Sequence, residues 1–486
     1  MEPIVQKTSD FGLAGMRRLL SEFGDPQNNI PVIHIAGTNG KGSTAACTAA
    51  ILAASGLKTG LYTSPHIEKY NERLRILEGR KAVENWSRDP WRSMIPTADL
   101  DDLREEIEIA RTRILPEVKM TVFDQLTASA FVWFAREGCQ AMVIETGLGG
   151  ELDATNVIDR DKVAVVTKIA VDHEKLLGHS LTRIAEAKAG IITERTCCLI
   201  LDNSLDVKGD IESPDYQKAI DLQHEILQVF TLRCAKLKTP FVLTDETTIR
   251  VTEDGSDPQR PDEVLSRRSF SLSEFDEVFT APLPGDHQVI NAALSIRAAR
   301  ALAPQLVTVD SIRAGLAGVY WPGRLQLLLN DPPLIFDAAH NLQGMRSAAR
   351  ALDDTFRGQK ILLLVAALAD KDWKPMMRAI MTDRSFSVGG VYCVTANSDR
   401  ALPARKLADW FRRLSNDHLN RYNVSDIAEF DEVEQAVRAV RQNQRLTGAP
   451  AFVSGSLYIA GEVMRVCSTI SEEEVQFELE RRGPKI

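Results

Sequence analysis

The sequence predicts an α/β protein with two domains, each built on a mostly parallel β-sheet. Short apolar runs of strand length alternate with helical segments, most of these runs end in polar residues, and the pattern starts again after Pro322-Gly323. Apolar runs without polar alternation are typical of strands that are buried on both faces, as parallel strands are. Their alternation with helices favours doubly wound sheets.

The first predicted strand is Val32–Ala36, a β-branched run that ends at a glycine-rich turn. A helix of small residues is expected after it, at Ser43–Ala54. Two further strands and a helix with Ser180 as its N-cap are predicted in the first half of the chain, at Ala141–Glu145, Val163–Ile169 and Leu181–Gly190.

Residues 202–277 are predicted to be an irregular insertion, because hydrophobic periodicity weakens there while charge, Pro and Ser increase. A second series of strands is expected at Leu334–Phe336, Ile361–Ala367, Val391–Thr395 and Ala451–Val453. We therefore expect a first domain over residues 1–320, a hinge at 321–324, and a smaller, Rossmann-like second domain over 325–486.

Charge and composition exclude several classes of protein. The 486 residues include 58 Lys and Arg against 67 Asp and Glu, which gives a net charge of −9, and the basic residues are dispersed. This argues against a nucleic acid or an anionic membrane as partner. The seven cysteines form no CxxC pair, and the first ten residues do not resemble a leader. We expect a soluble, cytoplasmic monomer that binds small molecules.

A glycine-rich loop joins the first strand to its helix, in the run Gly37-Thr38-Asn39-Gly40-Lys41-Gly42-Ser43-Thr44. Glycines let backbone amides approach phosphate oxygens, the helix N-terminus adds partial positive charge, and Lys41 can reach terminal phosphates. Gly42 separates the lysine from the hydroxyl, so the loop is a variant of the usual P-loop pattern. It predicts ATP binding, with Ser43 or Thr44 as a Mg²⁺ ligand; the alternative is a tight turn with a solvated lysine.

Polar side chains also follow the next strands. Glu145 ends one strand before a glycine loop, and Asp172-His173 follow another. Ligands bind at the carboxyl edge of open α/β sheets, so Glu145 and His173 are candidate Mg²⁺ ligands. The alternatives are a solvated carboxylate and a structural histidine. Lys188 has nothing in its spacing that distinguishes it from a surface lysine.

The second domain carries a similar cluster, Asp337 to Asn341, after its first predicted strand. Arg324 in the hinge can reach phosphates bound on the first domain, and Asp337 can accept from a ribose hydroxyl or an adenine amine. A salt bridge between these two residues is the alternative. Asn291, at the start of a helical stretch, is either part of a cap or a contact to the base.

Together these motifs resemble the folylpolyglutamate synthase and dihydrofolate synthase branch of the Mur ligase family. The resemblance covers almost the whole chain apart from 202–277, through Gly37–Ser43, Tyr62–His66, Asn71–Ile76, Glu145–Gly150, Asp153–Asn156, Asp172-His173, Lys188–Gly190, His287-Gln288, Trp321–Arg324, Asp337–Asn341, Ala367–Asp372 and Gly455–Tyr458. It implies an ATP- and Mg²⁺-dependent ligase that joins L-glutamate to a pteroate or folate carboxylate through an acyl phosphate.

The same resemblance implies the site residues. ATP is expected at Thr38, Asn39, Gly40, Lys41, Gly42, Ser43, Asn291, Arg324, Asp337 and His340. Mg²⁺ is expected at Ser64, Glu145, His173 and Lys188, the last as an N6-carboxylysine. The implied catalytic residues are Lys41, Glu145, His173 and Lys188. Dihydropteroate is expected at Thr8, Ser9, Asp10, Phe11, Thr121, Val122, Phe123, Asp124, Leu152, Asp153 and Ala154.

Within the branch, Asn39 and the run Leu152–Asn156 favour dihydrofolate synthase, because eukaryotic chain-extending relatives tend to read differently at both places. Folate polyglutamylation, alone or as a second activity, is the alternative, and a non-catalytic nucleotide-binding protein is a more distant one. Three residues depart from the family pattern. Glu151 stands where Arg is common, Lys168 where a small residue is usual, and Leu342 where Pro is usual.

Overall fold

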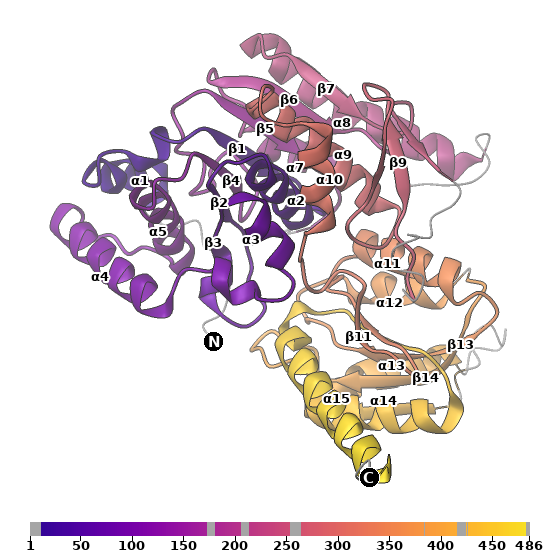
Figure 1. Ribbon diagram of the computed structural model, residues 1–486. Helices are drawn as coiled ribbons and strands as arrows, with labels where there is room; N and C mark the ends of the chain where they lie inside the picture. Colours follow the sequence, from indigo (N-terminus) through magenta and orange to yellow (C-terminus); the bar gives the residue numbers. More distant parts are fainter. Residues whose placement is uncertain are drawn as a thin grey trace.

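The computed structural model describes residues 11–172, 180–205, 213–252, 264–382, 384–415, 424 and 426–482. Their helices and strands form an α/β molecule with one large sheet in the N-terminal part of the chain and another in the C-terminal part (Figure 1). The predicted fold class is therefore confirmed. No helix in the described ranges is long and apolar enough to cross a membrane.

The N-terminal sheet is mostly parallel. Its described strands lie in the order β3-β2-β4-β1-β5-β6-β7, and among them β3 runs antiparallel to β2. They are β1 (Val32–Ala36), β2 (Thr59–Tyr62), β3 (Leu74–Leu77), β4 (Ala141–Glu145), β5 (Lys162–Val166), β6 (Thr196–Asp202) and β7 (Phe241–Thr244). Every residue of β1, β4 and β5 is buried, which explains why these strands lack polar alternation.

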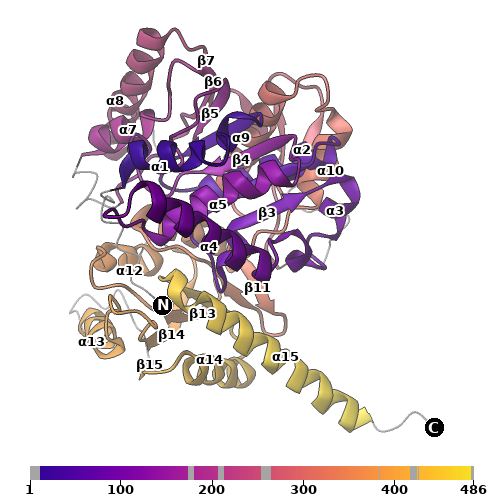
Figure 2. The same ribbon diagram turned by 90° about the vertical axis from the view of Figure 1, so that its left-hand side faces the viewer.

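Helices cover both faces of this sheet (Figures 1 and 2). One face packs against α2 (Lys41–Ala54), α3 (Gly79–Asn85), α9 (His287–Leu302) and α10 (Val309–Ala317). The other packs against α1 (Gly12–Ser21), α4 (Thr97–Ile114), α5 (Val122–Arg136), α7 (Leu181–Ala189) and α8 (Pro214–Leu237). α7 begins as predicted, because Ser180 Oγ accepts a hydrogen bond from Arg183 N at 3.2 Å.

The prediction of irregular structure over 202–277 is wrong for the described part of that segment. It contains α8, β7, β8 (Ile249–Val251) and β9 (Ser269–Leu272). β10 (Val278–Thr280), directly after the segment, completes an antiparallel sheet with β8 and β9. The described, fully buried side chains of α8 form a narrow stripe of Ile226, Phe230 and Cys234, packed in one cluster with α7. So narrow a stripe in a polar sequence gives a weak helical signal.

The C-terminal sheet has the order β11-β12-β16-β13-β14-β15 in its described strands, with β11 antiparallel to β12. They are β11 (Gln326–Leu329), β12 (Leu334–Phe336), β13 (Lys360–Val365), β14 (Ser387–Val394), β15 (Asp426–Phe430) and β16 (Ala451–Ser454). The predicted strands are confirmed as β12, with the predicted bounds, and as β13, β14 and β16, with shifted ends. β11 and β15 were not predicted, because both are edge strands with mostly half-buried or exposed residues and hence a weak apolar pattern.

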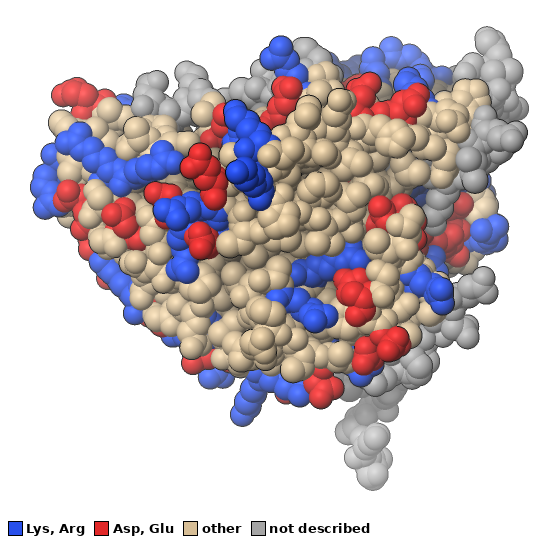
Figure 3. Space-filling view, turned by 90° about the horizontal axis from the view of Figure 1, so that it is seen from above, with Lys and Arg blue, Asp and Glu red and all other residues tan. Residues whose placement is uncertain are grey.

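This second sheet is also covered on both faces. α11 (Leu342–Thr355), α12 (Trp373–Met381) and α13 (Ala404–Ser415) pack on one face, and α14 (Val433–Thr447) and α15 (Ala460–Arg482) on the other. Figure 2 shows α15 running along the lower part of the molecule toward the C-terminus. On the face seen in Figure 3, Lys and Arg side chains are interspersed with Asp and Glu around a broad area of other residues.

Candidate active site

The loop after β1 has the geometry of an anion-binding turn. Gly40 has φ of 89° and precedes α2, and no side chain caps that helix start. The first amides of α2 are therefore open to an anion. Neighbouring side chains also approach this loop too closely for any residue other than glycine at two positions. A Cβ at Gly40 would lie 2.4 Å from Asn291 Oδ1, and one at Gly37 would lie 1.8 Å from Thr167 Oγ1.

The segment after β5 braces this loop from the side. Thr38 N and Asn39 N donate to Lys168 O, at 2.9 and 3.3 Å. Thr38 Oγ1 donates to Ala170 O at 3.0 Å and accepts from Ala170 N at 3.1 Å. The Lys168 ammonium donates to Ser204 O. Lys168, which departs from the family pattern, thus ties the brace to the end of β6.

Lys41, Glu145 and Lys188 converge beneath the loop. Lys41 Nζ lies 3.9 Å from Glu145 Oε1, and Lys188 Nζ donates to Gly37 O at 2.6 Å. Burial raises the pKa of Glu145, and the charge of Lys41 opposes that rise. Burial, reinforced by the charge of Lys41, lowers the pKa of Lys188 to about 7. Lys188 is therefore no surface lysine, because its amine is buried against the loop and its pKa lies well below the ordinary value.

The described residues of the predicted Mg²⁺ site suit a hard cation. Ser43 Oγ is buried and has no hydrogen-bond partner in the part of the chain that the structure describes. Glu145 Oε2 accepts from Ser64 N at 3.1 Å, so these two predicted ligands are adjacent. Oxygen ligands are what Mg²⁺ prefers. His173 lies outside the described residues, within which no group of three His, Cys, Asp or Glu could hold a metal.

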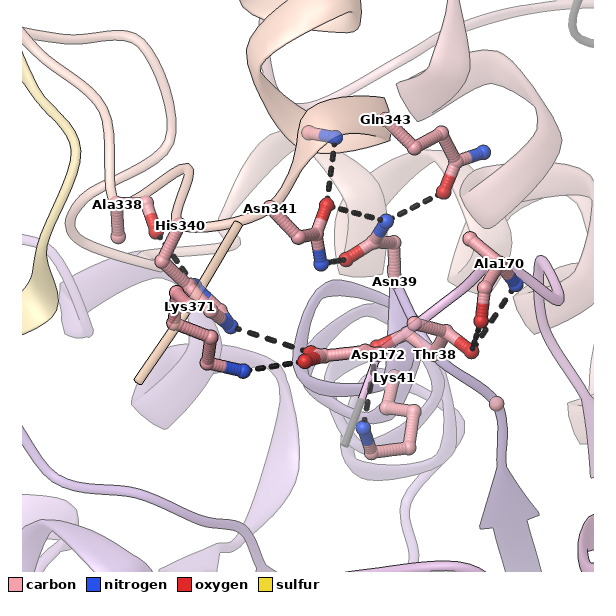
Figure 4. A network of polar contacts seen from close by, with 12 residues as sticks. Thr38, Asn39, Lys41, Ala170, Asp172, Ala338, His340, Asn341, Gln343 and Lys371 are labelled. Carbon is pink, nitrogen blue, oxygen red and sulfur yellow. Dashed lines mark hydrogen bonds and ion pairs between the residues drawn. The ribbon is translucent and has the colours of Figure 1, made fainter. Parts of the chain in front are cut away.

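Two polar networks join this edge of the first sheet to the second sheet (Figure 4). In one, the Asn39 side chain bonds to Asn341 and Gln343, at the start of α11. In the other, Asp172 pairs with the Lys371 ammonium and lies 3.8 Å from His340 Nε2. The loops after β1 and β5 therefore meet the loops after β12 and β13. Sequence reasoning gave no role to Gln343 or Lys371, although Lys371 follows a predicted strand.

Three predicted nucleotide-binding residues are engaged within the protein. Asp337 accepts from Leu325 N at 2.9 Å and from Ala339 N at 2.8 Å, and burial raises its pKa while Arg324 opposes the rise. Arg324 Nη1 donates to Gly323 O at 2.9 Å. Asn291 Nδ2 donates to Gln288 Oε1, with Asn291 Oδ1 directed at Gly40. Asp337 and Arg324 thus organise residues 323–339, and Asn291 backs the P-loop.

The residues predicted to hold dihydropteroate come from three segments of the chain, 8–11, 121–124 and 152–154. Thr121 and Asp124 cap α5 through reciprocal hydrogen bonds of 2.9 and 3.1 Å, and Phe123 packs on Gly147. Leu152 is 73% exposed on the crossover after the glycine loop. The other described members are half-buried Val122 and buried Phe11, Asp153 and Ala154, whereas Thr8, Ser9 and Asp10 lie outside the described residues. The exposed Glu151 is fixed by its backbone, whose N–H donates to Ala187 O at 2.9 Å.

A separate cavity of about 450 Å³ lies between α1, α4 and α5, with Phe23, Ile109 and Val132 in its wall. Its lining residues include none of the predicted site residues, and its charged members pair with each other, Arg113 with Glu22 and Arg136 with Glu106. The P-loop edge of the sheet is therefore the candidate active site.

Comparisons with known proteins agree with this site. A family model described as "Mur ligase, glutamate ligase domain" matches residues 323–456. The sequence is 32% identical to the folylpolyglutamate synthase of Lacticaseibacillus casei, over 95% of this chain and 95% of that protein. The chain belongs to the folylpolyglutamate synthase and dihydrofolate synthase family. It is also 30% identical to the dihydrofolate synthase/folylpolyglutamate synthase of Escherichia coli, over 96% of this chain and 93% of that protein.

Solved structures support the family assignment. Mycobacterium tuberculosis folylpolyglutamate synthase complexed with ADP and AMPPCP aligns with a TM-score of 0.74 and 26% identity, over 95% of this chain and 97% of that one. Escherichia coli FolC in complex with DHPP and ADP aligns with a TM-score of 0.72 and 26% identity, over 97% and 96%. As a member of this family, the chain is an ATP-dependent ligase that uses Mg²⁺-ATP for folate glutamate ligation. The predicted family, enzyme class and cofactors are confirmed.

Proposed function

We propose that this enzyme is a dihydrofolate synthase, which ligates L-glutamate to 7,8-dihydropteroate. The observation that carries the proposal is the convergence of Lys41, Glu145 and Lys188 beneath the P-loop. The exposed Leu152 follows Glu145 on the same crossover, so a pteroate carboxylate held there would lie near the ATP phosphates. Escherichia coli FolC, to which this chain is similar, has a solved structure in complex with DHPP and ADP, which supports binding of a pteroate substrate together with a nucleotide.

The reaction begins when the substrate carboxylate attacks the γ-phosphate of ATP, which forms an acyl phosphate and ADP. Lys41 neutralises charge that develops on the phosphoryl oxygens. Ser43, Ser64, Glu145 and His173 would hold Mg²⁺, which supplies further charge neutralisation when it is bound. The neutral amine of glutamate then attacks the acyl carbon, and the tetrahedral intermediate expels phosphate.

We propose that Lys188 acts as an N6-carboxylysine. A lysine captures CO₂ only as the neutral amine, and burial with Lys41 nearby gives Lys188 a pKa of about 7. The buried amine now donates to Gly37 O, beside the P-loop. Carboxylation would replace this amine with an anionic oxygen ligand beside Gly37 of the P-loop.

Closure of the second domain protects the acyl phosphate from water. We propose that the domains span residues 1–320 and 325–486, with a hinge at 321–324. Two contacts support this division. Asp337 accepts from Leu325 N directly after the hinge, and Asn341 of the second domain donates to Asn39 of the first. The site is then completed within one chain, which supports a monomer. The cysteines of the described residues are free, which suits a reducing cytoplasm.

Dihydropteroate is favoured over folate polyglutamates by Asn39, whose Oδ1 accepts from Asn341 Nδ2 at 2.9 Å. A lysine at this position, which eukaryotic chain-extending relatives tend to carry, has no acceptor for that bond. Polyglutamylation is the second candidate, favoured by the name of the Lacticaseibacillus casei relative.

A competition assay tests the choice of substrate. The purified enzyme receives Mg²⁺-ATP, labelled glutamate and equal amounts of 7,8-dihydropteroate and tetrahydrofolate. The proposal predicts that label enters dihydrofolate first. Incorporation into tetrahydrofolate but not into the dihydropteroate product would overturn it.

A further inference from the structure

The connection from β4 to β5 crosses over β1, because β4 and β5 lie on either side of that strand. The chain makes this crossing as residues 146–161, without a helix. Val32 and Ala36 of β1 pack with clusters on this face, whereas Ile33 and Ile35 pack with α2 and α9 on the other. His34 shares the face of Val32 and Ala36, since side chains alternate along a strand. It is the polar residue of β1 and lies under the crossover.

His34 is fully buried, and its side chain forms a hydrogen bond with the crossover. Its Nε2 lies 2.8 Å from Thr155 Oγ1. The Thr155 hydroxyl donates its single proton to Asp153 Oδ1 at 2.6 Å, so it can only accept from His34. The imidazole therefore carries its proton on Nε2. Burial keeps the pKa of His34 well below its ordinary value, consistent with a neutral ring.

Asp153 connects Thr155 to the glycine loop through hydrogen bonds. Its Oδ1 also accepts from Thr155 N at 3.0 Å, and its Oδ2 accepts from Leu148 N at 2.8 Å. Leu148 lies between Glu145 and the exposed Leu152 in the sequence. The Asp153 carboxylate therefore fixes the backbone that connects Glu145, a proposed Mg²⁺ ligand, to Leu152. The chain His34–Thr155–Asp153–Leu148 is continuous and buried up to its last member.

A second anchor holds the same crossover. Asn156 Nδ2 donates to Glu151 O at 3.1 Å and to Gly190 O at 3.2 Å, next to the helix that carries Lys188. Asn156 Oδ1 in turn lies 3.5 Å from the buried Lys162 Nζ, which also projects from the sheet below. The crossover thus rests on polar side chains, next to the apolar Val32 and Ala36 of β1. Buried polar groups are costly unless they are hydrogen-bonded, so replacing His34 by an aliphatic residue would be a simpler way to fill a core.

We propose that His34 is a positioning residue for substrate binding. It orients Thr155, and through it the Asp153 carboxylate, so that the glycine loop and Leu152 keep the shape that accepts the pteroate part of the substrate. His34 does not contact substrate or the reacting atoms. The identity of that substrate rests on the proposed function, whereas the positioning chain does not.

Thr155 offers a matched pair of variants that spares the buried histidine. Thr155→Val removes the hydroxyl at nearly constant volume, and Thr155→Ser keeps it. Loss of the two buried hydrogen bonds of this hydroxyl, to His34 and to Asp153, should raise the KM for dihydropteroate about tenfold in Thr155→Val. The KM for ATP should change by less than about twofold, because the P-loop is braced separately by Lys168 and Ala170. Thr155→Ser should behave as wild type. His34→Gln, which keeps a donor at the Nε2 position, should retain more of the wild-type KM than His34→Leu.

Amide hydrogen exchange at Leu148, measured without substrate, tests the positioning role separately from the identity of the substrate. Faster exchange in Thr155→Val than in Thr155→Ser, together with the rise in the KM for dihydropteroate, supports the positioning role. Wild-type exchange and KM in Thr155→Val overturn it, as does an equal loss in both variants. If wild type does not turn over dihydropteroate, the proposed function fails, and the exchange rates still decide whether the chain of hydrogen bonds holds the loop.

Discussion

Asn39 and Asn341, which are 302 residues apart, exchange a reciprocal pair of amide hydrogen bonds of 3.2 and 2.9 Å. Asn39 belongs to the P-loop, and Asn341 caps α11 by accepting from Gly344 N at 2.8 Å. The pair joins the nucleotide-binding loop directly to the helix that opens the second α/β unit (Figure 4). We therefore expect the binding of ATP to be coupled to the position of the second sheet through these two side chains.

A double-mutant cycle measures this coupling. We expect Asn39→Ala and Asn341→Ala each to lower kcat for ligation, with a coupling energy of about 1 kcal/mol in the cycle. Asn341→Ala should also lower the melting temperature, because it removes the N-cap of α11. Asn341→Asp keeps the cap acceptor but loses the donor to Asn39, so it is the control for the cap. Additive effects of the two alanine variants would contradict the coupling.

Ser43 tests the metal site without disturbing the fold. Its hydroxyl is buried without a hydrogen-bond partner among the described residues, so Ser43→Ala should leave the melting temperature of the ligand-free enzyme unchanged or slightly higher. The stabilisation on adding Mg²⁺-ATP should fall sharply, and Ser43→Thr should preserve it. Thermal shift measurements with and without Mg²⁺-ATP give both quantities. An undiminished Mg²⁺-ATP shift in Ser43→Ala would rule out Ser43 as a ligand.

Lys41 and Glu145 form the charged centre of the site. We expect Lys41→Ala and Glu145→Gln each to abolish ligation while shifting the melting temperature by only a few degrees. Burial disfavours the charged form of Glu145, so a neutral isostere should fold well. Initial rates and thermal unfolding of the same preparations provide the check. Ligation that persists in either variant removes the role assigned to that residue.

The depressed pKa of Lys188 has a consequence for stability. Between about pH 7, its pKa in the folded protein, and its ordinary value of 10.5, the unfolded chain binds a proton that the folded chain does not. The free energy of unfolding of wild type should therefore rise with pH over this range relative to Lys188→Met, and the difference should be flat below pH 7. Urea unfolding in CO₂-free buffer measures it. Parallel pH profiles would mean that Lys188 titrates normally.

Rescue tests the carboxylated form of Lys188 itself. Lys188→Ala should lose ligase activity, and short-chain carboxylates should restore part of it by supplying the missing anionic oxygens. Chloride at equal ionic strength is the control. A fully active alanine variant would end the carboxylysine proposal.

The sequence was informative where chemistry follows directly from a strand end. The P-loop and Glu145 could be placed on one edge because parallel strands share the direction of their carboxyl ends. Lys188 and Gly37 are 151 residues apart, and Asn39 and Asn341 are 302 residues apart. The spacing of residues along the chain could therefore not indicate these contacts. His34 lies inside an apolar run, so the sequence indicated only that it belongs to a strand. Its role depends on the crossover that the sheet order places above it.

The most direct test of the central claim follows oxygen during ligation. Dihydropteroate labelled with ¹⁸O in its carboxylate is incubated with the enzyme, Mg²⁺-ATP and glutamate, and the released phosphate is analysed by mass spectrometry. Activation of the carboxylate by Lys41 and its neighbours predicts that each phosphate carries one ¹⁸O from dihydropteroate. Unlabelled phosphate released together with dihydrofolate would contradict the account.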